Sequence, residues 1–285
     1  MPTKYYFDNA ATTPVREEVL QEILPYFREY YGNASSIYSI AKESKKALEA
    51  ARAKVAAAIG ATPDEIYFTA GGSESDNMAL RGVVNASKKE KKHIITTKIE
   101  HHAILHTAEF LETKGVDVTY LSVDECGKIS LEELENAICP ETVLISVMFA
   151  NNEIGTIQPI AEIGEIAKKH GVLFHTDAVQ AVGHVPIDVE KLQVDLLSMS
   201  GHKLGASKGI GAIYIRKGTR ISPLIFGGAQ EKKLRAGTEN IAGIVGLGKA
   251  AELAVAEMEE TTKKLTALRD KLIHGILESI PDSRL

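Results

Sequence analysis

The middle of this chain alternates short apolar runs, rich in β-branched residues, with longer amphipathic stretches, and this pattern restricts the folds open to it. Most of the runs are apolar throughout, as strands buried on both faces of a sheet are. The alternation predicts an α/β fold with a mainly parallel sheet covered by helices on both sides. The predicted strands are 66–69, 93–97, 116–121, 143–147, 172–175, 196–199 and 212–215, and the predicted helices between them are 74–85, 103–113, 131–138 and 160–169.

The two ends of the chain lack this alternation. Two helices are predicted early, at 17–30 and 39–59, and the second is rich in Ala, Lys and Glu. From 242 to 277 the pattern predicts one long helix without proline, although glycines weaken it locally. Because the chain stops a few residues later, with little left for such a helix to pack against, we expect it to be a fragment of a longer protein.

Composition argues against several classes of protein. Lys and Arg total 33 against 38 for Asp and Glu, and the net charge of −5 offers no electrostatic basis for nucleic-acid binding. No apolar run approaches the roughly 18–20 residues of a membrane helix, and the N-terminus lacks the apolar core of a signal peptide. Two cysteines are too few for a disulfide framework. The default expectation is a cytoplasmic protein with one large domain or two modest ones.

Two glycines stand between a predicted strand and a predicted helix. The strand ends at Thr69, Gly71 and Gly72 follow, and Ser73 stands where the helix opens. Glycines at such a place let the backbone turn tightly, so that free N–H groups and the helix N-terminus face one point, as in a phosphate cradle. The stretch is neither a Walker A sequence nor a G-x-G-x-x-G motif. The alternative is a simple glycine turn before a helix capped by Ser73.

A lysine directly follows a predicted core strand. Lys203 ends the stretch Ser200-Gly-His-Lys203, just after the run 196–199. Burying an ammonium group costs several kcal/mol unless the group is paired or used. A desolvated lysine has a lowered pKa and can form a Schiff base with an aldehyde. Lys208 follows in a glycine-flanked loop, and a solvated loop lysine is the alternative for either residue, but the position at a strand end favours Lys203.

An acidic residue stands at the end of another buried run. Asp177, in His175-Thr-Asp177, could face a cationic heterocycle or could be a structural cap. Ligands of open α/β sheets bind at the carboxyl ends of the strands, and the glycine turn, Lys203 and Asp177 all stand at such ends. Together they supply what pyridoxal phosphate (PLP) requires: a cradle for the phosphate, an amine for the aldehyde and an acid for the pyridine nitrogen.

Eight motifs of this chain resemble, in the same order, those of the NifS/IscS-type cysteine desulfurases, in the class V aminotransferase branch of fold-type I PLP enzymes. The resemblance covers essentially the whole chain, and eight motifs in family order are specific. It implies a three-layer α/β/α transferase fold with an N-terminal arm and an incomplete small domain. The motifs are Tyr6-Phe-Asp-Asn-Ala-Ala-Thr-Thr-Pro14, Gly32-Asn-Ala-Ser-Ser36, Gly72-Ser-Glu-Ser-Asp-Asn77, Glu100-His-His102, Asn151-Asn-Glu-Ile-Gly155, His175-Thr-Asp-Ala-Val-Gln180, Ser200-Gly-His-Lys203 and Arg235-Ala-Gly-Thr-Glu-Asn240.

The resemblance implies roles for the residues around the PLP ring. Lys203 would hold the cofactor covalently and move protons, and Asp177 would pair with the pyridinium nitrogen. His101 would stack on the ring face, as a second catalytic residue. Gln180 would hydrogen-bond the phenolic oxygen of PLP, and Asn152 would lie near both the ring and the substrate carboxylate.

Other residues would hold the phosphate group. The resemblance assigns this role to Gly72, Ser73, Ser200 and His202. It also assigns it to Thr238, which would reach the phosphate of the neighbouring subunit. A homodimer with active sites at the subunit interface is therefore expected.

Several of these residues have simpler interpretations. His102 and His106 are four residues apart, and two ligands on one helix face would suit zinc. No third ligand is signalled, so we expect no metal site. Asn152 could be a turn residue, and Thr238 could be an ordinary loop hydroxyl.

The chain departs from the family pattern at two points. Ser207 replaces a proline in the loop 204–209, which leaves the unfolded loop less rigid but removes no catalytic group. The family's nucleophilic cysteine and an arginine that binds the substrate carboxylate belong to a C-terminal small domain beyond Leu285. Cys126, in a turn after a strand, and Cys139, after a helix, do not match that motif. We expect neither to belong to the loops that carry the lysine and the aspartate.

The resemblance predicts a PLP-dependent desulfurase that converts L-cysteine to L-alanine and passes the sulfur on as a persulfide, for iron–sulfur cluster assembly or tRNA thiolation. Without the cysteine loop, the chain as given is expected to be inactive. The alternatives are a selenocysteine lyase or another class V enzyme, and a non-catalytic truncated homologue. The expected partners are a second copy of the chain and a sulfur-acceptor or iron–sulfur scaffold protein.

The resemblance also implies how the chain divides. Residues 1–14 would be an N-terminal segment associated with the small domain, and 15–255 would form the PLP-binding large domain. Residues 256–285 would be a long helix leading into a truncated small domain.

Overall fold

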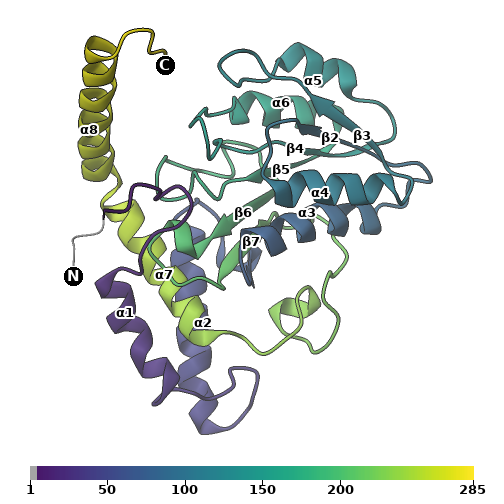
Figure 1. Ribbon diagram of the computed structural model, residues 1–285. Helices are drawn as coiled ribbons and strands as arrows, with labels where there is room; N and C mark the ends of the chain where they lie inside the picture. Colours follow the sequence, from purple (N-terminus) through teal and green to yellow (C-terminus); the bar gives the residue numbers. More distant parts are fainter. Residues whose placement is uncertain (1–4) are drawn as a thin grey trace.

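A seven-stranded sheet lies at the centre of the structure, a computed structural model that describes residues 5–285 (Figure 1). In space the strand order is β1-β7-β6-β5-β4-β2-β3. Strand β7 is antiparallel to both of its neighbours, and the other adjacent strands are parallel. The prediction of a mainly parallel α/β sheet is confirmed. The strands are β1 (Ile66–Thr69), β2 (His93–Thr97), β3 (Asp117–Leu121), β4 (Thr142–Ser146), β5 (Leu173–Asp177), β6 (Leu196–Ser200) and β7 (Gly211–Ile215).

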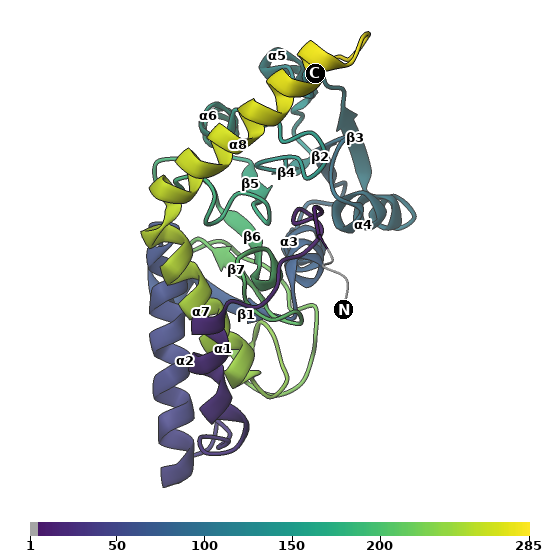
Figure 2. The ribbon, with the colours of Figure 1, turned by 60° about the vertical axis from the view of Figure 1, so that its left-hand side comes forward.

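Helices cover both faces of the sheet, which makes the three layers that were expected (Figures 1 and 2). One face packs against α3 (Gly72–Ala86) and α4 (His102–Glu112). Helix α1 (Glu17–Ile23) packs against α7, which belongs to the helix layer on the other face of the sheet. That opposite layer consists of α2 (Ser39–Ala57), α5 (Leu131–Ala137), α6 (Ile160–His170) and α7 (Ile241–Ala256).

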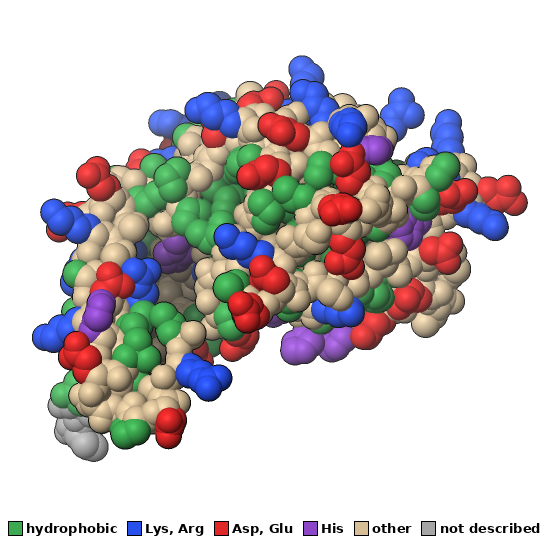
Figure 3. Space-filling model, turned by 90° about the horizontal axis from the view of Figure 1, so that it is seen from above, with side chains coloured by type: hydrophobic (Ala, Val, Ile, Leu, Met, Phe, Trp, Pro, Cys, Tyr) green, Lys and Arg blue, Asp and Glu red, His purple; other side chains and the backbone are tan. Residues whose placement is uncertain are grey.

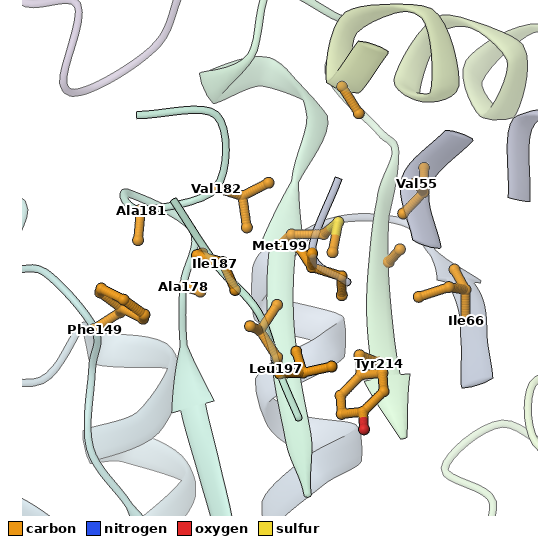
Figure 4. Packing of buried hydrophobic residues seen from close by; sticks show 14 of the residues in the cluster. Val55, Ile66, Phe149, Ala178, Ala181, Val182, Ile187, Leu197, Met199 and Tyr214 are labelled. Atoms are coloured by element: carbon orange, nitrogen blue, oxygen red, sulfur yellow. The ribbon is translucent and has the colours of Figure 1, made fainter. Parts of the chain in front are cut away.

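Neighbouring residues along a strand belong to different sides of the core, because successive side chains of a strand point to opposite faces. Ile95 and Ile145 pack into the cluster that contains α2 and α7, whereas Ile94 and Leu144 pack with α3 and α4. All four are completely buried. Figure 4 shows the first of these clusters around Tyr214. Burial on both faces explains why the strands read as continuously apolar runs.

The prediction of a single helix at 242–277 was wrong, because the chain forms two helices there. Helix α7 ends at Ala256, and α8 (Met258–Ser279) begins after Glu257. No glycine or proline stands at the break, but the Glu257 carboxylate binds the guanidinium group of Arg16 through two contacts of 2.8 Å. Helix α7 is largely buried, whereas α8 has no buried residue and extends away from the sheet in Figure 1.

The predicted helix at 17–30 is also shorter than expected. Helix α1 ends at Ile23, and a 3₁₀ turn, η1 (Leu24–Phe27), follows it. Pro25 stands at the start of this turn and has no backbone N–H to continue the helical ladder. The predicted helix at 39–59 is confirmed as α2, which ends two residues early.

The N-terminal segment lies against the loop that follows β6. The backbone N–H of Thr13 donates to the His202 carbonyl oxygen at 3.0 Å, and that of Arg16 donates to the Gly205 carbonyl oxygen at 2.9 Å. Of the expected segment 1–14, residues 1–4 lie outside the described residues. The described part is thus held at the carboxyl edge of the sheet.

The outer surface carries charges of both signs. Acidic and basic side chains are interspersed over the face seen in Figure 3. No helix within residues 5–285 is long and apolar enough to cross a membrane.

Candidate active site

A pocket of about 410 Å³ lies at the carboxyl ends of β5 and β6. Asp177 is the last residue of β5, and Lys203 ends η3 (Gly201–Lys203), the 3₁₀ turn that follows β6. The pocket gathers nine of the ten residues predicted for the site, which come from separate parts of the chain. They are Gly72, Ser73, His101, Asn152, Asp177, Gln180, Ser200, His202 and Lys203.

The N-terminus of α3 forms one wall of the pocket. The helix begins at Gly72 and has no side-chain cap. Because Ser73 lies inside the first turn, the alternative of a helix capped by Ser73 was wrong. A Cβ atom on Gly72 would lie 2.7 Å from Cγ2 of Val179 and 3.6 Å from Cβ of Ser200. Glycine therefore allows the uncapped N–H groups and the positive end of the helix dipole to approach the loops after β5 and β6.

Lys203 is partly buried and lines the same pocket. Its Nζ donates to the backbone oxygen of Ala11 at 2.9 Å, a contact with the N-terminal segment. Burial lowers the pKa of the ammonium group, and the carboxylates of Asp8 and Asp177 partly oppose that effect. A lysine with a lowered pKa is more often neutral and nucleophilic at neutral pH. Lys208, the alternative lysine, is exposed and does not line the pocket.

Asp177 is almost fully buried beneath the same pocket. Its Oδ1 accepts a hydrogen bond from the backbone N–H of Val179 at 2.9 Å. Burial raises the pKa of this carboxyl group, while the Val179 N–H, His101 and Lys203 all act to lower it. The aspartate therefore caps a turn, as one interpretation of the sequence held, and it also lines the pocket. That it faces a cationic heterocycle stays a prediction.

His101 joins the pocket to the start of α4. It is the N-cap residue, and its Nδ1 accepts a hydrogen bond from the Ala103 N–H at 3.1 Å. The rings of His102 and His106 lie 5.1 Å apart, on the outside of the helix. Within residues 5–285, no three His, Cys, Asp or Glu side chains are grouped as metal ligands would be.

Three further predicted residues line the pocket with polar groups. The Gln180 amide donates to the Ala10 carbonyl oxygen at 2.9 Å, which holds the N-terminal segment across the pocket. The Asn152 amide donates to the Glu153 carboxylate at 2.7 Å. His202 lies between Ser200 and the lysine and is half-buried, and burial lowers the pKa of its ring.

Thr238 is the one predicted residue that the structure leaves outside the pocket. It is exposed, in the loop that precedes α7. The same loop is tied to the pocket by Arg235, whose Nε donates to Glu74 Oε1 at 2.8 Å in the first turn of α3. A role for Thr238 in a neighbouring subunit stays a prediction.

The sequence analysis missed two buried carboxyl groups beside the site. Asp76 lines the pocket and is 1% exposed, and Glu100 lies behind it at 6% exposure. Two signals could have revealed them. Asp76 follows Ser73 by three residues, which places both on one helix face, and Glu100 directly precedes His101.

The two cysteines lie at opposite edges of the sheet. Cys139 lies near the amino ends of the strands, with Sγ 3.4 Å from Nδ1 of His93, the first residue of β2. The exposed Cys126 follows β3, and its carbonyl oxygen accepts a hydrogen bond of 2.6 Å from the hydroxyl of Thr156. Since Thr156 belongs to the loop that carries Asn152, Cys126 lies at the carboxyl edge of the sheet. Neither cysteine belongs to the loops that carry Lys203 and Asp177, as expected. Neither cysteine lines the pocket itself.

Comparison with known proteins identifies the family of this fold and pocket. Residues 5–285 match the model of the class V aminotransferases. The chain is 62% identical over 280 residues to cysteine desulfurase IscS of Methanosarcina thermophila, a match that covers 98% of this chain and 69% of that protein. The chain belongs to the cysteine desulfurase family. The predicted resemblance is thus confirmed.

Solved structures of this family share the fold. A NifS-like protein matches with a TM-score of 0.94 and 47% identity, over 97% of this chain and 76% of that one. A structure of SspA in complex with cysteine matches with a TM-score of 0.86 and 45% identity, over 87% of this chain and 72% of that one. These matches confirm the three-layer fold that the desulfurase resemblance implied.

The desulfurase family implies PLP as cofactor, and the residues of the pocket fit this group. The uncapped N-terminus of α3 suits a phosphate, and a half-buried lysine suits an aldehyde. A buried carboxyl group, Asp177, suits a protonated ring nitrogen. A Cβ atom on Gly72 would clash with Val179, so the close approach of helix and loop depends on the glycine.

Proposed function

We propose that this desulfurase holds PLP in the pocket and acts on L-cysteine, to give L-alanine and a persulfide on an acceptor thiol. The observation that carries the proposal is the convergence of Lys203, Asp177 and the uncapped N-terminus of α3 on one pocket. The name of the Methanosarcina relative and the cysteine bound to SspA support this substrate. When bound, PLP supplies an aldehyde that condenses with amines and a ring that accepts an electron pair.

The chain's own residues would hold the cofactor at both ends. The first N–H groups of α3 and the hydroxyl of Ser73 would bind the phosphate, together with Ser200 at the end of β6 and His202 in η3. Asp177 would hold the proton of the ring nitrogen, since a buried carboxylate favours a cationic partner. Gln180 would hydrogen-bond the phenolic oxygen.

Other residues would orient the substrate and move protons. The Nζ of Lys203 would take the proton from the substrate α-carbon, a role that its lowered pKa supports. His101 would lie over the ring face as the second catalytic residue. Asn152 would bind near the substrate carboxylate.

Lys203 should be the only lysine that binds PLP covalently. After incubation with PLP and reduction with borohydride, a peptide that contains Lys203 should carry the added mass of the cofactor. Lys203→Ala should abolish the labelling, whereas Lys208→Ala, a matched change in an exposed loop five residues away, should leave it intact. Mass spectrometry of the digested protein provides the measurement. Labelling of Lys203→Ala to the same extent as wild type would refute the assignment.

The sulfur step needs a thiol within reach of the substrate. Overall, L-cysteine and a thiol RSH give L-alanine and RSSH, so the Cβ–S bond breaks, an S–S bond forms, Cβ gains a proton and no external oxidant is required. The reactive form of the acceptor is its thiolate. The chain supplies two thiols, and neither lines the pocket. We therefore propose that the 285-residue chain alone binds cysteine but transfers its sulfur slowly.

Product assays test this step. With PLP and L-cysteine, the absorption spectrum of the protein should change, while alanine and sulfide stay near background. Losing a covalent nucleophile commonly costs about 10³-fold or more in rate. Cys126→Ser and Cys139→Ser should change neither product. Turnover at an ordinary enzyme rate that disappears in Cys126→Ser would show that this thiol, beside the Asn152 loop, is the acceptor.

A further inference from the structure

A second buried carboxyl group lines the pocket beside Asp177. Asp76 lies on α3, one turn after Ser73, and only 1% of it is exposed. Its Oδ1 is buried and has no hydrogen-bond partner among the described residues. The nearest basic atom recorded, Nε2 of His175, lies 3.8 Å away, beyond hydrogen-bond distance. The Ser198 hydroxyl is the one group that favours the ionised form of this carboxyl group, so a buried negative charge here has little to stabilise it.

His175 does not provide that stabilisation. The ring is completely buried, with Nδ1 2.9 Å from the hydroxyl of Ser146 and Nε2 3.0 Å from the hydroxyl of Ser198. Burial lowers the pKa of this histidine to about 3, so the ring is neutral at neutral pH. Asp76 therefore faces a neutral imidazole and a serine hydroxyl rather than a cation.

The two buried aspartates of the pocket, Asp76 and Asp177, have unequal surroundings. Asp177 accepts a backbone N–H at 2.9 Å and is close to two basic side chains, whereas Asp76 has neither advantage. Two neighbouring carboxylates in a buried site rarely both ionise. Burial and the charge of Asp177 hold the pKa of Asp76 well above its ordinary value. The titratable groups around Asp76 are Asp177 and His175 on β5, Glu100 and His101 between β2 and α4, and Lys203 in η3.

We propose that Asp76 is a positioning residue whose carboxyl group stays protonated and thereby leaves Asp177 as the single carboxylate that faces the ring nitrogen of PLP. A neutral carboxyl group can donate its O–H within the pocket, which a carboxylate cannot do. The part of this inference that concerns the ring nitrogen rests on the proposed function. The protonation state of Asp76 is set by residues of this chain, so it can be measured without the cofactor.

Carbon-13 NMR of the full chain, labelled at the aspartate carboxyl carbons, measures that charge directly. The resonance that disappears in Asp76→Asn belongs to Asp76. We expect it at the position of a protonated acid at pH 7, both with and without PLP. Asp177→Asn should lower its titration midpoint by about one pH unit or more, because a neighbouring negative charge is removed. If the carboxyl carbon of Asp76 already has the chemical shift of a carboxylate at pH 6, the proposal is overturned.

Cofactor affinity tests the consequence for Asp177. Asn is a neutral mimic of a protonated Asp, so Asp76→Asn should bind PLP within about threefold of wild type and keep the same absorption maximum. Asp177→Asn should weaken binding by about tenfold or more, because it removes one full charge beneath the ring. Asp117→Asn, an exposed change at the amino end of β3, is the control.

The outcomes separate the two ideas. An Asp76→Asn variant that loses PLP as severely as Asp177→Asn would mean that Asp76 carries the charge, which overturns the inference. An Asp177→Asn variant that binds PLP like the wild type would instead refute the proposed role of Asp177. In that case the NMR titration still decides whether Asp76 is protonated.

Discussion

At the scale of single residues, burial determines which acidic groups of the pocket carry charge. Glu100 lies behind the pocket wall and accepts hydrogen bonds at Oε1 from the Met148 N–H at 2.9 Å and the Thr97 hydroxyl at 2.8 Å. Its Oε2 is buried without a partner. Burial raises the pKa of this carboxyl group to about 8. Glu100 is therefore mostly protonated at neutral pH.

Glu100→Gln should change how stability depends on pH. In the unfolded chain a glutamate titrates near about 4.3, and in the folded chain Glu100 titrates near 8. The stability that the protonated group contributes is thus complete below about pH 4.3 and is lost as pH rises through 8. Wild type should lose stability over this range relative to Glu100→Gln, by an amount on the order of a few kcal/mol.

Denaturant unfolding between pH 5 and 9 measures this difference. Glu109→Gln, an exposed change on α4, is the matched control and should follow wild type at every pH. Parallel profiles for wild type and Glu100→Gln would show that Glu100 is ionised in the folded protein.

At the scale of elements, the layer of α1, α2 and α7 depends on close packing of backbones. A Cβ atom on Gly248 of α7 would lie 2.8 Å from Cα of Ala51 in α2. Glycine weakens a helix by about 1 kcal/mol relative to alanine. Its presence in α7 is explained by the close packing of this helix against α2. Helix α8 differs, because a Cβ on its Gly275 meets nothing within 4 Å.

Alanine should therefore have opposite effects in the two helices. Gly248→Ala should destabilise the protein by about 1–3 kcal/mol, since α2 and α7 must move apart. Gly275→Ala should leave global stability unchanged or raise it by up to about 1 kcal/mol, because it improves helix propensity without a clash. Urea unfolding followed by circular dichroism compares them. Equal effects of the two changes would contradict the close approach at Gly248.

At the scale of the whole molecule, one predicted site residue, Thr238, lies outside the pocket of its own chain. Thr238 is exposed, yet its loop is anchored to α3 through Arg235 and Glu74. The loop is also held by Glu231, whose carboxylate binds the buried guanidinium of Arg52 at 2.8 and 2.9 Å. A loop held this firmly can present Thr238 to a neighbouring subunit at low entropic cost.

The chain should therefore form a homodimer in solution. Light scattering should give twice the chain mass of 30.8 kDa. Thr238→Ala should keep the dimer but bind PLP more weakly, by about tenfold or more for the loss of one hydrogen bond to a charged group. Ser222→Ala, in a loop of the same chain outside the pocket lining, serves as the control. A stable monomer that binds PLP with the affinity of the dimer would refute a shared site.

The strands, most of the helices and most of the pocket lining could be predicted from the sequence. The apolar runs became the strands because burial on both faces demands continuous hydrophobicity. Lys203 and Asp177 were recognisable because polar groups at the ends of such runs are costly unless they are used. All seven strands were predicted, and nine of ten predicted residues line one pocket.

Only the tertiary structure decided the features that depend on residues far apart in the chain. The break at Glu257 accompanies an ion pair with Arg16, more than two hundred residues away, and no local signal marks it. The place of Cys126 beside the Asn152 loop follows from a parallel register that a sequence does not display. The protonation of Asp76 depends on what surrounds it, because the charge of an acid is set by burial and neighbours, and these exist only once the strands lie side by side.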